Sequence, residues 1–155
     1  MQHRREFLRG IGRGGLVAAL LSSGLLSIPR AWAATRNQAA FDAKTVEDAF
    51  AALGAGTPQQ SAEITLEAPE IAENGAVVPI TVTSAIAGTE AVAILVEKNP
   101  NALAAVTMTP MGTEPYVSTR VKMQQTSRVI ALVRAKGGFF MASKDVKVTL
   151  GGCGG

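Results

Sequence analysis

Histidine, cysteine and tryptophan each occur once among the 155 residues, so the chain has few groups for metal or acid–base chemistry. His3 and Trp32 lie near the N-terminus, and Cys153 is the third residue from the C-terminus. Outside the N-terminal segment, these counts exclude His/Cys zinc sites, haem attachment through C-x-x-C-H and triads with a histidine base. A single cysteine also excludes an intramolecular disulfide. We therefore expect no metal site and no cofactor.

The chain also lacks a basic surface once its first 33 residues are set aside. Of 15 basic and 12 acidic residues, that segment holds five arginines and one acid, Glu6. The remainder has 10 basic and 11 acidic residues, a net charge of −1. Binding to nucleic acid thus loses its main electrostatic support, and we expect no nucleic-acid partner.

The N-terminal segment reads as an export signal. The pair Arg4-Arg5 precedes an apolar stretch from Leu16 to Leu26, and small residues precede a cleavage position after Ala33. The paired arginines are typical of twin-arginine signals. The apolar stretch is shorter than the roughly 20 residues of a membrane-spanning helix, so an uncleaved anchor is disfavoured. We expect residues 1–33 to be removed and the mature chain to be periplasmic.

One short helix is predicted at the start of the mature chain, over residues 45–53. Apolar residues recur there with helical spacing. Thr45 can cap the N-terminus, with Asp48 three residues further on, and Gly54 can end the helix.

Beyond Gly56 the pattern changes to the alternation of β-strands. Runs lie near residues 64–66, 78–82, 92–96, 103–109, 117–123, 129–133, 139–142 and 146–150, with Gly, Pro and Asn between them. Seven or eight short strands predict an all-β, immunoglobulin-like antiparallel sandwich over residues 34–150. Lys136-Gly137-Gly138 predicts a hairpin, and the unbroken apolar run 129–133 predicts a central strand.

Four methionines in this region raise the question of a copper site: Met108, Met111, Met123 and Met141. Soft copper sites usually recruit His or Cys as well, and none is available within the sandwich. Methionines scattered in strands are more often core residues, and that is the interpretation favoured here.

The chain ends in Gly151-Gly152-Cys153-Gly154-Gly155, which we interpret as a flexible carrier arm. Glycine has the widest backbone freedom, and a short terminal segment without apolar side chains cannot bury itself. Three residues beyond a strand ending at Leu150, the sulfur can lie roughly 10 Å from the sandwich. No cation in the arm activates the thiol, and a free cysteine has a pKa of about 8.5. A carrier activated by its partners is therefore favoured over an enzyme.

Three alternatives remain open for this terminus. Cys153 could be an incidental thiol, although an exposed thiol is a liability in an oxidising compartment. It could form an intermolecular disulfide that makes a covalent dimer of a binding or structural module. The terminal Gly154-Gly155 could instead act through its carboxylate, as in ubiquitin-like sulfur carriers, but that chemistry needs ATP and fits poorly with an exported all-β protein.

Taken together, the signal, the helix, the sandwich and the terminal Gly-Gly-Cys-Gly-Gly resemble the SoxY family of thiosulfate-oxidising bacteria. Further matching stretches are residues 68–75, 77–80, 98–100, 119–122 and 146–150. The resemblance implies that Cys153 is the attachment point for sulfur intermediates and that Gly151, Gly152, Gly154 and Gly155 give the arm its freedom.

The same resemblance implies a set of partners. A SoxZ-like subunit would form a heterodimer with this chain. A haem-containing enzyme would couple thiosulfate to the thiol, and a di-manganese hydrolase would release sulfate. In many organisms a molybdenum-haem sulfane dehydrogenase follows.

Overall fold

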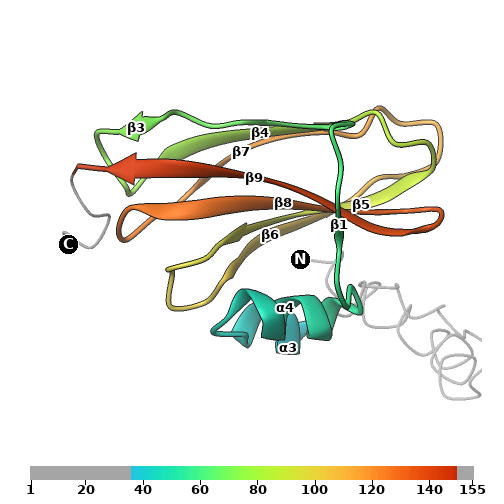
Figure 1. Cartoon of the computed structure of the whole chain (residues 1–155), viewed down its shortest axis with the longest axis horizontal. Helices are drawn as coiled ribbons and strands as arrows, with labels where there is room; N and C mark the ends of the chain where they lie inside the picture. Colours follow the sequence, from blue (N-terminus) through green and yellow to red (C-terminus); the bar gives the residue numbers. More distant parts are fainter. Residues whose placement is uncertain (1–35, 150–155) are drawn as a thin grey trace, which may run out of the picture. The chain divides into compact units, whose positions relative to one another are not determined.

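The computed structural model describes residues 36–149, which form a two-layered β-sandwich with two short helices on one side (Figure 1). The predicted signal, with Arg4, Arg5 and the cleavage position Ala33, lies outside the described residues. So do Leu150 and the predicted arm. The immunoglobulin-like, all-β fold class predicted from the strand pattern is confirmed.

The predicted helix is present as α4 (Val46–Leu53). The Thr45 hydroxyl accepts a hydrogen bond from the Asp48 N–H at 3.1 Å, and Gly54 ends the helix in the left-handed region at φ 74°. A second helix, α3 (Gln38–Asp42), was not predicted. Its five residues are too few to show a helical period, so the prediction of a single helix is wrong.

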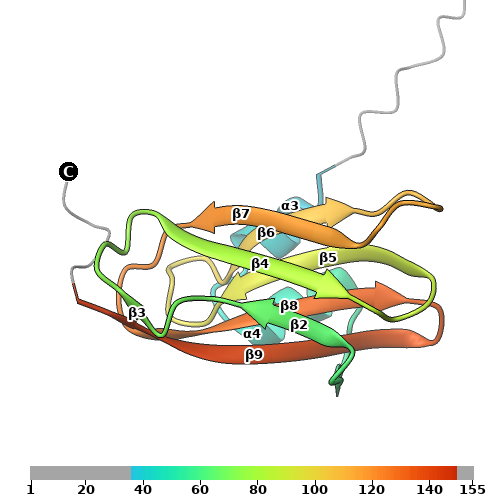
Figure 2. The ribbon, with the colours of Figure 1, turned by 90° about the horizontal axis from the view of Figure 1, so that it is seen from above.

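The larger sheet has six strands, ordered β1-β9-β8-β5-β6, with β3 also paired to β9. The strands are β1 (Gln59–Gln60), β3 (Ile71–Ala72), β5 (Thr89–Val96), β6 (Leu103–Met108), β8 (Ser127–Ala135) and β9 (Gly138–Val148). The smaller sheet, ordered β2-β4-β7, contains β2 (Ile64–Glu67), β4 (Val78–Ser84) and β7 (Tyr116–Val121). In Figure 2, β6 and β7 run along one long edge of the sandwich, and β2 and β9 along the other.

Strand β8 shows why residues 129–133 are apolar without interruption. Val129, Ala131 and Val133 belong to the core between the two sheets. Ile130 and Leu132 belong to a second core beneath the helices. A central strand that is covered on both faces has no position for a polar side chain, and the prediction of a central strand is confirmed.

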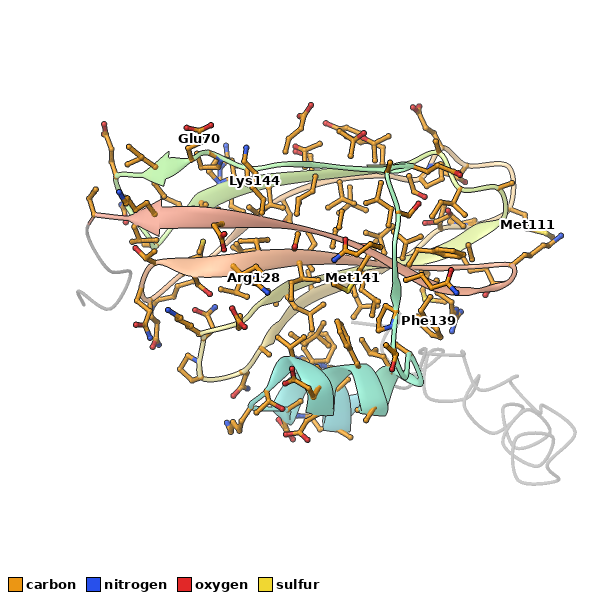
Figure 3. All side chains as sticks on the ribbon, in the orientation of Figure 1. Glu70, Met111, Arg128, Phe139, Met141 and Lys144 are labelled. Carbon is orange, nitrogen blue, oxygen red and sulfur yellow. The ribbon has the colours of Figure 1, made fainter. Side chains whose placement is uncertain are left out.

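The helices close the second core by covering the outer face of the larger sheet. Phe50 of α4 is buried there, and Phe139 and Met141 point from β9 toward the helices (Figure 3). Burying an apolar side chain of this size contributes about 1.5–3 kcal/mol. The helices are therefore part of the domain's hydrophobic core.

Strand β9 corrects the predicted strand count. Residues 139–142 and 146–150 were expected to form separate strands, but Gly138–Val148 is one continuous strand paired with β8. The predicted hairpin at 136–138 is confirmed, with Gly137 and Gly138 both at positive φ. The sandwich is also not wholly antiparallel, because β1 and β3 each pair with β9 in parallel.

The methionines divide between core and surface. Met123 is fully buried, and Met141 packs against the second core. Met108 is 58% exposed and Met111 is 100% exposed. The interpretation as core residues is therefore wrong for Met108 and Met111. Within residues 36–149 no group of three or more potential metal-ligating His, Cys, Asp or Glu side chains occurs.

None of the helices in the described part is both long and apolar enough to span a bilayer.

Candidate functional site

The predicted site residues Cys153, Gly151, Gly152, Gly154 and Gly155 lie outside the described residues. What the structure shows is the base from which they extend, the end of β9. This base lies at one short end of the sandwich, next to β3 (Figure 1). Its construction determines where the terminal segment starts and how firmly that starting point is held.

Backbone hydrogen bonds hold the last residues of β9 to the segment around β3. The Lys147 N–H donates to the Glu70 carbonyl at 2.9 Å, and the Thr149 N–H donates to the Ala72 carbonyl at 3.1 Å. The Thr149 hydroxyl also donates to the Glu73 carbonyl at 3.2 Å. The chain is thus held on this side as far as Thr149, the last described residue.

The opposite side of β9 is held as well. Ser127 of β8 pairs with Val146, and the Val148 N–H donates to the Thr126 hydroxyl oxygen at 3.0 Å. Val146 is fully buried, and Val148 packs against the core between the sheets. Hydrogen bonds on both edges and an apolar inner face make the base of the terminal segment a fixed point.

Lys144 extends this support toward the approach to β3. Its ammonium group donates to the Ala68 carbonyl at 2.7 Å, immediately before Pro69. Figure 3 shows Lys144 and Glu70 on the same side of β9. Proline has no N–H to give to a sheet, so a side-chain donor helps to hold the segment that leads into β3.

Loops at the same end of the sandwich are bonded to one another. The Asn99 amide donates to the Lys122 carbonyl at 2.6 Å, and the Asn99 side-chain oxygen accepts from the Gln124 N–H at 3.2 Å. The Met123 N–H donates to the Gly75 carbonyl at 2.6 Å. The loops at the end that carries the C-terminal segment are therefore held together by hydrogen bonds.

The surface around the base is mixed in character. Ile71 is 58% exposed, and it pairs with exposed Lys147 so that both side chains lie on the outer face of the larger sheet. Glu70 and Glu73 on either side of β3 are also exposed. The sequence pattern missed β3, because two residues cannot show alternation, although Pro69 and Asn74-Gly75 mark its limits.

These features define an immunoglobulin-like sandwich whose last strand is fixed up to a short terminal segment containing its one cysteine. A family model described as "Sulfur oxidation protein SoxY" matches residues 49–153, more than half of the chain. The chain belongs to the SoxY family, and its role is that of a sulfur carrier within a sulfur-oxidising system.

One solved structure agrees with this assignment. The sulfur carrier protein SoxY from Chlorobium limicola f. thiosulfatophilum is 37% identical, with a TM-score of 0.62, over 68% of this chain and 97% of that one. A superoxide reductase (neelaredoxin) from Ignicoccus hospitalis is 19% identical, with a TM-score of 0.49, over 55% and 79%. The human F-spondin reeler domain is 11% identical, with a TM-score of 0.42, over 60% and 93%. Neither of these two similarities bears on function. No curated protein matches significantly.

Membership of the family favours a carrier subunit without catalysis of its own. It also implies partners of the sulfur-oxidising system, such as SoxZ.

Proposed function

We propose that Cys153 carries sulfur intermediates covalently during thiosulfate oxidation and that residues 151–155 present them to partner enzymes. The observation that carries this proposal is the match of the family model up to residue 153, the cysteine itself. The fixed base at Thr149 supports it, because a mobile carrier needs a defined anchor.

The loading step joins the Cys153 sulfur to the outer sulfur of thiosulfate. The thiol loses its proton, a sulfur–sulfur bond forms, and two electrons pass to a haem-containing partner, which gives a cysteine S-thiosulfonate. A di-manganese hydrolase then adds water across the bond to the terminal sulfonate, which releases sulfate and leaves a persulfide on Cys153. A sulfane dehydrogenase can oxidise the remaining sulfur. The metals and haem belong to these partners.

The distance from the anchor limits where these enzymes bind. Four peptide units separate Thr149 from Cys153, so the two Cα atoms lie at most about 14 Å apart. An enzyme that takes the cargo must therefore contact the short end of the sandwich around the base of β9. We propose that export by the signal at residues 1–33, cleaved after Ala33, places this reaction in the periplasm.

The decisive experiment replaces the cysteine. With the partner proteins supplied, Cys153→Ser is expected to abolish thiosulfate-dependent turnover, and intact mass spectrometry of the wild type should show adducts confined to the C-terminal peptide. Adducts that persist on a chain truncated after Leu150 would refute the proposal.

A disulfide-linked dimer through Cys153 is the competing explanation of the same residue. This explanation predicts a dimer band on a non-reducing gel that reductant converts to monomer, together with full turnover by Cys153→Ser. Turnover by that variant therefore distinguishes the dimer from the sulfur carrier.

A further inference from the structure

Apolar side chains are exposed mainly along one long edge of the sandwich, far from β9. Of the six large apolar residues that are exposed in residues 36–149, four lie on β6, on β7 or between them: Val106, Met108, Met111 and Tyr116. Figure 2 shows both strands along that edge, and Figure 3 shows Met111 at the tip of the connection. Val106 lies opposite Ala93, which belongs to the core beneath the helices, so Val106 and Met108 project from the outer face of the larger sheet. Tyr116 alternates with the inward-facing Val117 and projects from the outer face of the smaller sheet. Apolar residues left exposed along an edge are often found at interaction sites.

Along this edge, β6 also has backbone groups that pair with no other described strand. In the described residues β6 pairs only with β5. The Thr109 N–H donates to the carbonyl of Glu90, which lies opposite it on the neighbouring strand. Because backbone groups alternate in an antiparallel pair, the N–H and C=O groups of Thr107 and Ala105 also face β5. Val106 and Met108 then direct their N–H and C=O groups outward.

Strand β7 repeats this arrangement in the other sheet. It pairs only with β4 among the described strands, and the Ser84 N–H donates to the Pro115 carbonyl at 3.0 Å. The same alternation turns the backbone groups of Ser118 and Arg120 outward, whereas the Tyr116 N–H donates to the Glu114 carbonyl at 2.8 Å. The two open strands lie along the same long edge of the sandwich, and together they are called the β6–β7 edge, comprising residues 103–108, 111 and 116–122.

Open edges in soluble proteins usually carry charges, prolines or bulges that prevent pairing with another chain. The part of β6 from Ala105 to Met108 has no charge and no proline, and the bulge of this strand lies further along, near Leu103. The outward N–H and C=O groups of Val106 and Met108 can be paired by an extended strand of another chain, and the uncharged neighbourhood favours a strand without charges.

The charges on β7 indicate which chain supplies that strand. Arg120 and Lys122 are exposed, and neither forms an ion pair with a described residue. Strands β6 and β7 contain no acid, and the connection between them contributes one exposed carboxylate, Glu114, so a second copy of this edge would bring two cations and only one carboxylate. A different subunit with carboxylates opposite β7 is favoured.

We propose that the β6–β7 edge is where the partner subunit of the carrier complex docks, adding an uncharged strand to β6 and placing acidic side chains against Arg120 and Lys122. This inference rests on the proposed function, which requires a partner that stays bound while the arm visits successive enzymes. The edge is compatible with that requirement, because β8 and β5 separate β6 from β9, the strand that leads to the base of the arm.

The test measures binding of the purified SoxZ-like subunit to the mature chain and its variants by titration calorimetry. Val106→Lys is expected to weaken binding by at least about 10-fold, because the lysine would stand on the sheet face beside the uncharged side chains of the added strand, without a carboxylate partner. Thr65→Lys, at an exposed position on the other edge strand β2, is the matched control and should bind as the wild type does. Thermal melting establishes that both variants fold.

Two further readouts are specific to this mode of docking. Hydrogen exchange at the Val106 and Met108 amides should slow in the complex. Arg120→Glu should slow association about 10-fold at low salt, whereas Lys136→Glu, a charge reversal in the exposed β8–β9 turn, should not. The proposal fails if folded Val106→Lys binds the partner subunit as the wild type does. It also fails if the Val106 and Met108 amides exchange as fast in the complex as in the isolated chain. Protection of these amides in the isolated chain, caused by dimerisation through this edge, would overturn it as well.

The outcome is separable from that of the proposed function. Tetrathionate loads a thiolate by exchange: the sulfur attacks one inner sulfur, an S-thiosulfonate forms and thiosulfate leaves. Val106→Lys should still take up this adduct on Cys153 as seen by intact mass. Failure of every variant to load would count against the carrier role while leaving the docking result intact.

Discussion

The length of chain between Thr149 and Cys153 should control transfer to the partner enzymes. Thr149, the last described residue, is held by hydrogen bonds to Ala72 and Glu73. Deleting Gly151 and Gly152 removes two of the four peptide units, so the maximal reach from the anchor falls from about 14 Å to about 7 Å. A misplacement of only 1 Å can cost about 10²-fold in rate, so we expect thiosulfate-dependent turnover to fall by at least that factor.

Two controls separate reach from reactivity. Replacing the same glycines by Ser-Ser keeps the length and should retain turnover within about a factor of ten, since mainly flexibility changes. Loading by tetrathionate, a small molecule that needs no docking, should be unchanged in the deletion variant. If the shortened chain turned over thiosulfate at the wild-type rate, the anchored carrier would be the wrong description of this terminus.

Two further predictions concern the domain that carries the arm. Ile94→Ala removes a fully buried side chain between the sheets and should lower the free energy of unfolding, measured by urea denaturation, by about 2–5 kcal/mol. Ile71→Ala, at an exposed position, should change this free energy little. Equal effects of the two substitutions would contradict the assigned core. Thr126→Val removes the acceptor of the Val148 N–H and should cost about 1 kcal/mol, with faster exchange of the Val148 amide and no such effect from exposed Thr65→Val. Unchanged exchange at Val148 would show that this bond does not hold the base.

Local sequence patterns were sufficient for most secondary-structure elements. The spacing from Val46 to Leu53, between a capping Thr45 and Gly54, predicted α4, because capping and helical period depend on neighbouring residues. Alternation predicted the long strands for the same reason. Local patterns failed for α3, β1 and β3, which are too short to show a period. The positions of these elements depend on contacts with distant residues such as Ala52, Phe140 and Lys147.

The candidate site divides in the same way. The single cysteine between two glycine pairs could be recognised from the sequence, because residue types alone indicate a nucleophile on a segment with wide backbone freedom. The support beneath it is not, because the partners of the last strand come from residues 70–73 and 126, far away in the chain.

The methionines show the same limit in the sandwich. Sequence spacing treated Met108 and Met123 alike, yet one is exposed on an edge strand and the other is fully buried.

By itself, the sequence determined the strand and helix periods, the class of the fold and the chemistry available at Cys153, because these follow from residue type and local spacing. Only the tertiary structure decided which strands are edges, which apolar side chains remain exposed on them and how β9 is held up to Thr149. Those properties arise from pairing between segments distant in sequence, which no local pattern specifies.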